Sequence, residues 1–170
     1  MATAAFHVRR ATADDAEGIT AVLRTIAAER VYSAIDRAWS VEEQRRYLGS
    51  LSDREAFHVA VSADGEVIAY QSLDRYSSLL ASMAHVAQLG TFTLPAWRGR
   101  GVGRALFAAT RRFAAAAGYR KVVIQVRGSN SAAQSFYQGL GFAACGRLRA
   151  QVVIDGRDDD EIVMEYFLTE

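Results

Sequence analysis

The spacing of apolar residues in the first part of the chain predicts two helices. Between Thr12 and Tyr32, apolar side chains recur every three or four positions, which is the period of a helix that buries one face. A second, shorter helix is predicted at 40–51, where Ser40 and Glu43 form the pattern of a capping box. Each predicted helix therefore begins at a residue whose side chain can accept a hydrogen bond from first-turn amides.

Strand-like runs surround these two helices. One run lies at 6–11, and two more lie within 56–76 on either side of Asp64-Gly65, a dipeptide typical of a hairpin turn. Another run at 85–94 ends at Pro95, the only proline in the chain, and proline cannot continue an internal strand.

The second half of the chain predicts two more helices and three more strands. Helical spacing runs from Gly103 to Gly118, a short apolar strand follows at 121–127, and helical spacing returns at 130–140. Two final strands near 142–154 and 161–168 flank an acidic turn. The order β-α-α-β-β-β-α-β-α-β-β predicts an α/β fold, with a mixed, mostly antiparallel central sheet of about seven strands and helices on both faces.

The composition narrows the possible functions. A chain of 170 residues, about half of them apolar, is expected to form one packed domain over 1–170. The net charge of +1 argues against a broad surface for nucleic acid or membrane, and no apolar run approaches the ~20 residues of a membrane helix. No secretory signal is visible in residues 1–10, so we expect a cytoplasmic protein.

Cys145 is the only cysteine, which excludes an intrachain disulfide and fits a reducing compartment. A free cysteine is most often a small buried apolar side chain, so we expect Cys145 to be packed rather than nucleophilic.

The joint before the third helix combines loose backbone with positive charge. Glycines at 99, 101 and 103 allow tight turning and close approach of a ligand, and arginines stand at 98, 100 and 104. A helix that begins there presents free N–H groups and the positive end of its dipole, so the joint predicts a site for a phosphate-type anion. The alternative is a flexible turn with solvated arginines.

Two motifs carry a resemblance to a known family. The stretch RGRGVG at 98–103 resembles the Arg/Gln-x-x-Gly-x-Gly/Ala signature of the GNAT superfamily of N-acetyltransferases. The stretch NSAAQSFYQGLGF resembles the second motif of that family, and the order of elements is similar from residue 6 to 168. The residues that match the second motif are Asn130, Ala133, Tyr137, Gly141 and Phe142.

The resemblance implies acetyl-coenzyme A as co-substrate and no metal. Its diphosphate would lie on the turn formed by Arg98, Gly99, Arg100, Gly101, Val102 and Gly103. The strands at 85–94 and 121–127 would be parallel neighbours that splay apart, and the pantetheine arm would pair with main-chain groups at Phe92 and Leu94. Gly90 could permit a bulge in this strand. Asn130 is interpreted either as a helix cap or as a polar contact to the coenzyme arm.

The resemblance also assigns Tyr137 as the general acid, because a phenol with a pKa near 10 stays protonated at neutral pH. The base is open, since the resemblance places Gln88 at the position that holds a glutamate in many members of the family, and an amide cannot take a proton. His85 and Glu29 are the two candidates, acting directly or through water, and a structural role is the alternative for each.

The acceptor is expected to be a primary amine that attacks the thioester directly, with a small molecule or an α-amine favoured. Presenting a lysine-type amine in neutral form at pH 7 costs ~4.6 kcal/mol, against ~1.2 kcal/mol for an α-amine, which matters if the base is weak. Glu29, Tyr32 and Gln88 are candidates for contacts with the acceptor, and the acidic run at 155–161 either attracts a cation or is a solvated hairpin tip.

Two other functions stay open: acetylation of protein N-termini or lysines, and a coenzyme-binding sensor without catalysis. A homodimer through the last strands is also possible, and the scattered arginines do not form the continuous stripe that a nucleic-acid binder needs.

Overall fold

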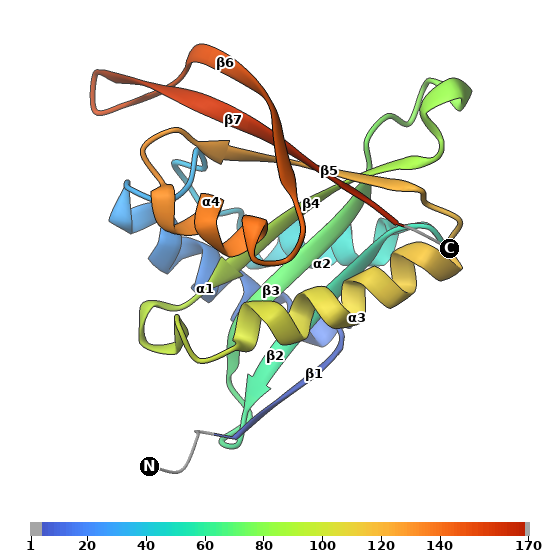
Figure 1. The fold of residues 1–170 in the computed structure, drawn as a ribbon. Helices are drawn as coiled ribbons and strands as arrows, with labels where there is room; N and C mark the ends of the chain where they lie inside the picture. The colour runs from blue at the N-terminus through green and yellow to red at the C-terminus, as the bar shows by residue number, and fades with distance from the viewer. Residues whose placement is uncertain (1–4, 169–170) are drawn as a thin grey trace.

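The computed structural model describes residues 5–168, so the two ends of the expected 1–170 domain, including residues 1–4 of the segment searched for a secretory signal, lie outside the described residues. Seven strands form one sheet in the order β1-β2-β3-β4-β5-β7-β6 (Figure 1). No helix within 5–168 is long and apolar enough to cross a membrane. The strands are β1 (Phe6–Arg10), β2 (Ala56–Ser62), β3 (Val67–Arg75), β4 (Val86–Thr93), β5 (Lys121–Arg127), β6 (Ala143–Ile154) and β7 (Arg157–Phe167).

Helices cover both faces of this sheet, with α1 and α2 behind it and α3 and α4 in front in the view of Figure 1. The predicted fold class and element order are therefore confirmed. Short 3-10 turns lie at Ala13–Asp15, Ala81–Met83 and Pro95–Trp97. The helices are α1 (Ala16–Glu29), α2 (Val41–Ser50), α3 (Val102–Ala116) and α4 (Ser131–Gln138).

The core consists of apolar stripes of the helices packed on β-branched and aromatic strand residues. Ile19, Leu23 and Ile26 of α1 pack on one face of β2 and β3. Leu106 and Phe107 of α3 are buried on the other face. The periodicities of the sequence thus become the two halves of a core divided by the sheet.

The first helix is shorter than its apolar period predicts. It ends at Glu29 because Arg30 takes a left-handed conformation, with φ of 55°. The carbonyl oxygen of Arg30 accepts a hydrogen bond from Nη1 of Arg127 at 2.9 Å, which fixes this end of the helix against β5. The segment from Val31 to Ser40 is an irregular connection that runs beside the sheet.

The acidic run at 155–161 is not a loop, which corrects the predicted start of the last strand. The hairpin turn is only Asp155-Gly156, both with positive φ, and β7 already begins at Arg157. A two-residue turn of this kind matches the twist of the flanking strands. Most of the acidic side chains therefore alternate along a strand.

The parallel pair β4 and β5 separates partway along its length, as the resemblance predicted. Pairing covers only Val86↔Lys121 to Gln88↔Val123, although β4 continues to Thr93 and β5 to Arg127. The register of β4 with β3 is unbroken from Ala87 to Thr93, so the expected bulge at Gly90 is wrong. The gap opens because β5 stays paired with β7 while β4 stays paired with β3.

Candidate active site

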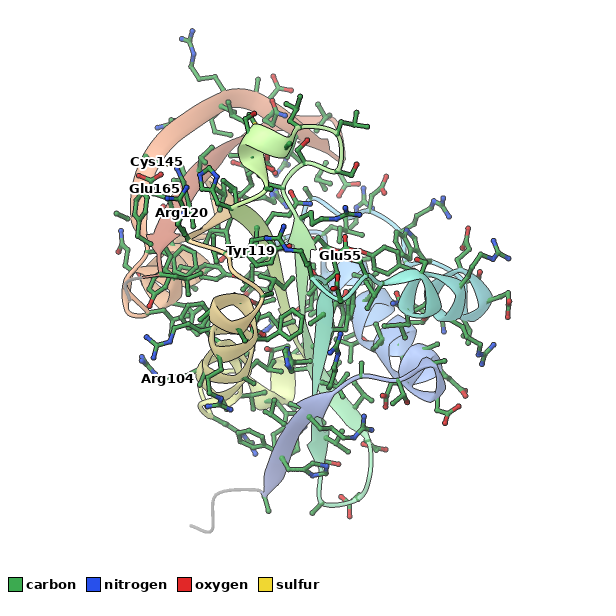
Figure 2. All side chains as sticks on the ribbon, turned by 90° about the vertical axis from the view of Figure 1, so that its right-hand side faces the viewer. Glu55, Arg104, Tyr119, Arg120, Cys145 and Glu165 are labelled. Atoms are coloured by element: carbon green, nitrogen blue, oxygen red, sulfur yellow. The ribbon has the colours of Figure 1, made fainter. Side chains whose placement is uncertain are left out.

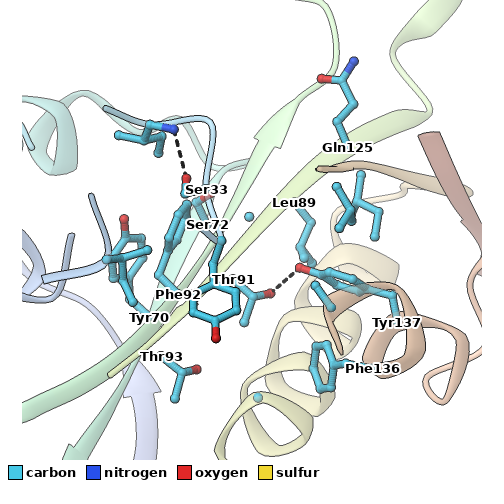
Figure 3. A pocket seen from close by; sticks show the side chains of 18 of the residues that line it. Ser33, Tyr70, Ser72, Leu89, Thr91, Phe92, Thr93, Gln125, Phe136 and Tyr137 are labelled. Carbon is cyan, nitrogen blue, oxygen red and sulfur yellow. Dashed lines mark hydrogen bonds between the residues drawn. The ribbon is translucent and has the colours of Figure 1, made fainter. Parts of the chain in front are cut away.

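A large cavity of ≈ 1130 Å³ lies at the gap between β4 and β5 and reaches both faces of the sheet. Figure 3 shows Tyr70 and Phe92 on one side of β4, Tyr137 and Phe136 on the other side, and Thr91 between them. The cavity continues to the turn that precedes α3, where Gly99, Gly101 and Gly103 line it. One continuous space therefore joins the predicted anion site to the predicted general acid.

The turn before α3 presents a row of free main-chain amides. The N–H groups of residues 99–104 have no hydrogen-bond partner within 5–168, and the first helical bond is Ala105 N–H to Gly101 O at 3.0 Å. Gly99 and Gly101 have φ of 72° and 81°, a region that glycine adopts without strain, and nothing lies within 4 Å of where a Cβ would stand. Free amides, a helix N-terminus and open space in front of them fit an anion.

Gly103 serves a different purpose in the same turn. A Cβ at this position would stand 2.8 Å from Cζ of Phe136, so glycine permits the close contact between α3 and α4. Gly99 and Gly101 therefore allow the backbone conformation of the turn, whereas Gly103 allows the two helices to pack closely.

Arg98 does not point its side chain at the free amides. Its Nη1 and Nη2 donate to Oε1 and Oε2 of Glu29 at 2.9 and 2.5 Å, its Nε donates to the carbonyl of Thr93, and its guanidinium lies 4.5 Å from the centre of the Tyr32 ring. Arg98 thereby ties the end of α1 and the following connection to the turn.

The other two arginines of this segment lie differently. The guanidinium of Arg100 lies over Trp97, and Arg104 lines the cavity.

Tyr137 lies where the gap opens. Its side chain is 6% exposed, and its hydroxyl donates to Oγ1 of Thr91 at 2.9 Å. Burial raises the pKa of Tyr137 to about 12, so the phenol is fully protonated at neutral pH and can give a proton to an atom that becomes negative beside it.

Asn130 is confirmed as the cap of α4 and also ties the connection after α1. Its Oδ1 accepts from Ala133 N at 3.0 Å, and its Nδ2 donates to the carbonyl oxygen of Tyr32 at 3.1 Å. Tyr32 is thus held twice, through its ring by Arg98 and through its carbonyl by Asn130, and it lines the cavity.

The main-chain groups that face the gap belong to the odd-numbered residues of β4. Leu94 N–H donates to Ile68 O and Tyr76 N–H donates to Val86 O, so even-numbered residues direct these groups to β3. The pairing expected at Phe92 and Leu94 is therefore wrong by one residue, and Thr91 and Thr93 face the gap. The ring of Phe92 lines the cavity, stacked on Tyr70 with ring centres 4.8 Å apart.

The two candidate bases from the sequence are not placed in the cavity. His85 precedes β4, and its carbonyl accepts from the amides of Arg120 and Lys121. Glu29 is engaged with both of its oxygens by Arg98. Neither residue lines the cavity, whereas Gln88 does.

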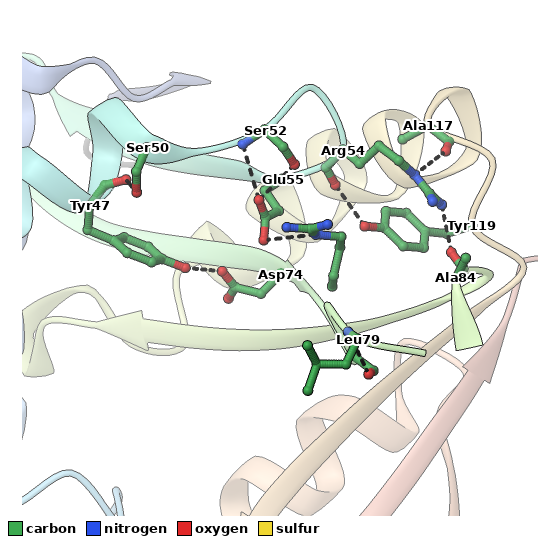
Figure 4. Close-up of polar contacts among 12 residues, drawn as sticks. Tyr47, Ser50, Ser52, Arg54, Glu55, Asp74, Leu79, Ala84, Ala117 and Tyr119 are labelled. Atoms are coloured by element: carbon green, nitrogen blue, oxygen red, sulfur yellow. Dashed lines mark hydrogen bonds and ion pairs between the residues drawn. The ribbon is translucent and has the colours of Figure 1, made fainter. Parts of the chain in front are cut away.

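Asp74 is a cavity carboxylate that the sequence motifs did not reveal. It lies on β3 directly opposite Gln88 in the antiparallel register, and Tyr47 of α2 donates a hydrogen bond to its Oδ1 (Figure 4). Burial raises the pKa of Asp74, and Glu55 raises it further, while the Tyr47 hydrogen bond opposes these effects. No motif marks Asp74; the alternation of β3 and the register with Gln88 are the only signals that could have found it.

Most of the acidic run at 155–161 is engaged in ion pairs. Asp155 pairs with Arg30, Asp159 with Arg127, and Asp160 with Arg147. Glu161 is the member that lines the cavity, and burial raises its pKa. Neither alternative from the sequence holds for the run as a whole, because its carboxylates mainly fasten β7 to neighbouring segments.

Cys145 is exposed on β6, so the prediction that it is packed is wrong. Figure 2 shows it beside Glu165 on the outer part of the β6–β7 hairpin. Partial desolvation and the Glu165 carboxylate raise the pKa of the thiol, and Cys145 does not line the cavity. Within 5–168, no group of three or more His, Cys, Asp or Glu side chains could hold a metal ion.

Comparisons with known proteins agree with this geometry. The model of the acetyltransferase (GNAT) family matches residues 23–142. YwnH of Bacillus subtilis (strain 168), assigned as a phosphinothricin acetyltransferase, is 24% identical over 153 residues, which are 90% of this chain and 93% of that protein.

Two solved structures show the same fold. One is a GCN5-related N-acetyltransferase from Kribbella flavida, 28% identical, with a TM-score of 0.84 over 96% of this chain and 98% of that chain. The other is a phosphinothricin acetyltransferase from Sinorhizobium meliloti in complex with AcCoA, 23% identical, with a TM-score of 0.89 over 97% of this chain and 89% of that chain.

Since the family model spans more than half of the sequence, the chain belongs to the acetyltransferase (GNAT) family. The predicted family and enzyme class, an acyltransferase, are confirmed.

Proposed function

We propose that this protein transfers the acetyl group of acetyl-coenzyme A to a primary amine, which attacks directly while both substrates are bound. The observation that carries the proposal is a single cavity with free amides of the 99–104 turn at one end and the Tyr137 hydroxyl at the β4–β5 gap. A diphosphate and a thioester of the same molecule would meet these two features together.

The residues present fit the coenzyme. The free amides before α3 would hold its diphosphate, with Arg104 adding positive charge, and the gap-facing main-chain groups of Thr91 and the amide of Thr93 would pair with its amide-containing arm. When bound, the coenzyme supplies an acetyl group activated as a thioester. Tyr137 would then give its proton to the departing sulfur, whose basicity is near that of a free thiol, about 8.5.

Direct attack is favoured over an acyl-cysteine intermediate, because Cys145 lies outside the cavity and its thiol pKa is raised. A cysteine nucleophile needs a depressed pKa and an adjacent base.

A small-molecule acceptor is supported by the cavity, whose volume of ≈ 1130 Å³ must hold both the acceptor and part of the coenzyme. Phosphinothricin, which appears in the names of two relatives, is one compound of this size against which the choice of acceptor can be tested. The preference for an α-amine assumed a weak base. This assumption no longer applies, because Asp74 provides a carboxylate opposite Gln88. A protein N-terminus or lysine, and a sensor without catalysis, are the alternative functions.

A homodimer through the last strands stays a prediction, consistent with β6, which is an edge strand exposed along most of its length.

The first test is calorimetry of the purified protein with coenzyme A, followed by release of its thiol from acetyl-coenzyme A in the presence of a panel of amines. Tyr137→Phe should lower kcat by about 10²-fold or more while coenzyme affinity stays unchanged, because only proton donation is lost.

Tyr166→Phe is the matched control. It removes a hydroxyl that contacts Arg111 and lies outside the cavity, so its kcat should stay at the wild-type value. Absence of coenzyme binding would contradict the proposal, and binding without acetylation of any amine would favour the sensor.

A further inference from the structure

Asp74 lies at a position from which its carboxylate can contact an amine bound in the cavity. It is half-buried and lines the cavity, and it faces Gln88 across the β3–β4 register, at the last residue of β4 that still pairs with β5. Directly opposed residues on antiparallel strands have Cβ atoms about 5 Å apart, so Asp74 presents a carboxylate beside the closed end of the gap.

Tyr47 holds this carboxylate in place. Tyr47 lies on α2, packs edge-to-face on Trp39 and Phe57 at 5.2 and 5.7 Å between ring centres, and donates to Oδ1 of Asp74. The tyrosine is thus fixed by its ring, and its hydroxyl orients one carboxylate oxygen, while a carboxylate can accept further hydrogen bonds, including one from a ligand.

The wall around Asp74 is aromatic. Side chains from the connection after α1, from α2 and from three strands surround the same part of the cavity, and they offer flat apolar surface with few charged groups. The aromatic residues on this side are Trp39, Tyr47, Phe57, Tyr70, Tyr76 and Phe92.

Positive charge is missing from this end of the cavity. Within 5–168, the basic residues that line the cavity are Arg98, Arg104 and Arg127. Arg98 is bound to Glu29, Arg127 is bound to Asp159, and Arg104 lies in the first turn of α3. A second carboxylate, Glu161, lines the cavity as well. An acceptor with an acidic group would therefore meet negative charge without a free cation to offset it.

A neutral donor also faces this space. Gln44 of α2 is 2% exposed and lines the cavity, yet its Nε2 has no hydrogen-bond partner within 5–168. A buried donor without a partner is costly, so an uncharged oxygen of a ligand would relieve it.

We propose that Asp74, oriented by Tyr47, binds the ammonium group of the acceptor and takes its proton, and that the acceptor is an aromatic or apolar monoamine without an acidic group. This inference rests on the acetyltransferase function proposed above and names the base and substrate class of that same site.

The proton and bond changes balance without a further reactant. The ammonium gives one proton to the Asp74 carboxylate, which later releases it to solvent, and the neutral nitrogen forms its N–C bond as the C–S bond breaks. The sulfur leaves with the bond's electron pair and takes the Tyr137 proton. The second proton lost by the nitrogen, carried through water, restores Tyr137.

The surroundings of Asp74 predict how the rate depends on pH. The ionisable groups near it are Tyr47 of α2, Glu55 before β2, Tyr70 of β3 and Tyr119 before β5, and Arg75 is paired with Glu55 at 3.5 Å. Burial raises the pKa of Asp74, and only its ionised form can accept a proton. The rate should therefore fall as pH decreases through this raised pKa, and the Tyr47→Phe variant should move the fall to higher pH because a donor to the carboxylate is lost.

The substrate class is tested with a matched pair of acceptors, 2-phenylethylamine and L-phenylalanine, which differ only by a carboxylate next to the amine. We expect kcat/KM for 2-phenylethylamine to be higher by about 100-fold, because the added carboxylate would lie beside Asp74 with no free cation to offset the repulsion. Equal or faster acetylation of L-phenylalanine, or of phosphinothricin, would overturn the substrate class. It would leave the proposed acetyltransferase function intact.

The base is tested with Asp74→Asn. At pH 7 the rate should fall by about 10²- to 10⁴-fold. Most of this loss should disappear near pH 10, where solvent removes the amine proton instead. A merely structural role would lower the rate equally at every pH, and that result would overturn the inference.

Glu66→Gln is the control for lost charge. It removes an exposed carboxylate next to the β2–β3 turn, roughly 25 Å along β3 from Asp74, and should change neither rate nor pH profile. Coenzyme affinity measured by calorimetry should equal wild type in Asp74→Asn. Failure of the wild type to bind coenzyme would instead refute the proposed function, so the two failures are distinguishable.

Discussion

The two ends of the cavity are built from different parts of the polypeptide. At the coenzyme end, the ligand would meet the main chain: consecutive amides of residues 99–104 and the gap-facing groups of Thr91 and Thr93. At the acceptor end, it would meet side chains that come from distant segments, with Tyr47 on α2, Asp74 on β3 and Gln88 on β4. One end is set by backbone conformation over a few adjacent residues, and the other by the register of the whole sheet.

This difference determines what a substitution can do at each end. A site made of amides tolerates many side chains, provided that the backbone turn is preserved, whereas a site made of side chains changes its chemistry with a single residue. The coenzyme end is therefore suited to one ligand that stays the same, whereas the side chains at the acceptor end determine the acceptor specificity of this chain.

Gly101→Val should break the coenzyme end with the largest effect on binding. Gly101 has φ of 81°, where a β-branched residue is strained, and the turn that presents the free amides would have to change. Loss of one hydrogen bond to a charged phosphate costs about 1.5–3 kcal/mol, which corresponds to a roughly 10- to 150-fold weaker coenzyme Kd by calorimetry.

Gly65→Val is the matched control for Gly101→Val. Gly65 also has positive φ, 85°, and open space where the Cβ would stand, but it lies in the β2–β3 hairpin away from the cavity. Both variants should unfold more easily by about 1–2 kcal/mol, and only Gly101→Val should bind coenzyme more weakly. Equal coenzyme affinity in the two variants would show that the turn does not hold the diphosphate.

The same difference explains how much of the site could be predicted from the sequence. The glycine turn, the start of α3 and the cap of α4 depend on neighbouring residues, and all were found from local patterns. Asp74 could not be found in this way, because its position opposite Gln88 depends on the register of two strands that the sequence alone does not align.

The prediction of main-chain contacts was wrong by one residue, because it depends on which alternate residues of a strand direct their N–H and C=O groups to a given neighbour. The resemblance implies main-chain pairing in the gap at Phe92 and Leu94, whereas the main-chain groups of Phe92 and the amide of Leu94 face β3, and nothing in the run at 85–94 marks which residues face which neighbour. The fold class was accessible because it depends on the order and type of elements, which apolar periodicity reports. The end of α1 at Arg30 was not, because tertiary contacts with Arg127 contribute to it.

Arg98, Glu29 and Asn130 connect the segments that form the two ends. The Glu29→Gln variant tests whether the role of Glu29 is structural or catalytic. Both oxygens of Glu29 are bound by Arg98, and the side chain lies outside the cavity. The variant should lose about 0.5–1 kcal/mol of unfolding free energy, because a partly exposed ion pair contributes little. Its rate should change by less than about fivefold, with the acidic fall of the pH profile unmoved.

Chemical denaturation and a pH–rate series measure both effects, with Asp74→Asn assayed in parallel. A flattened pH profile in Glu29→Gln, with a normal one in Asp74→Asn, would exchange the roles of the two carboxylates.

Cys145→Ala should have the smallest effect, since it lies beyond both ends of the cavity. The thiol is exposed on β6, and a nucleophile there would have to carry the acetyl group from the β4–β5 gap across β5 and β7 to the edge of the sheet. The substitution should change the unfolding free energy by less than about 0.5 kcal/mol and leave kcat at the wild-type value. Mass spectrometry after mixing with acetyl-coenzyme A should find no acetyl group on Cys145. A loss of rate in Cys145→Ala together with an acetylated thiol in the wild type would mean that transfer proceeds in two steps, and the direct attack of the amine would have to be abandoned.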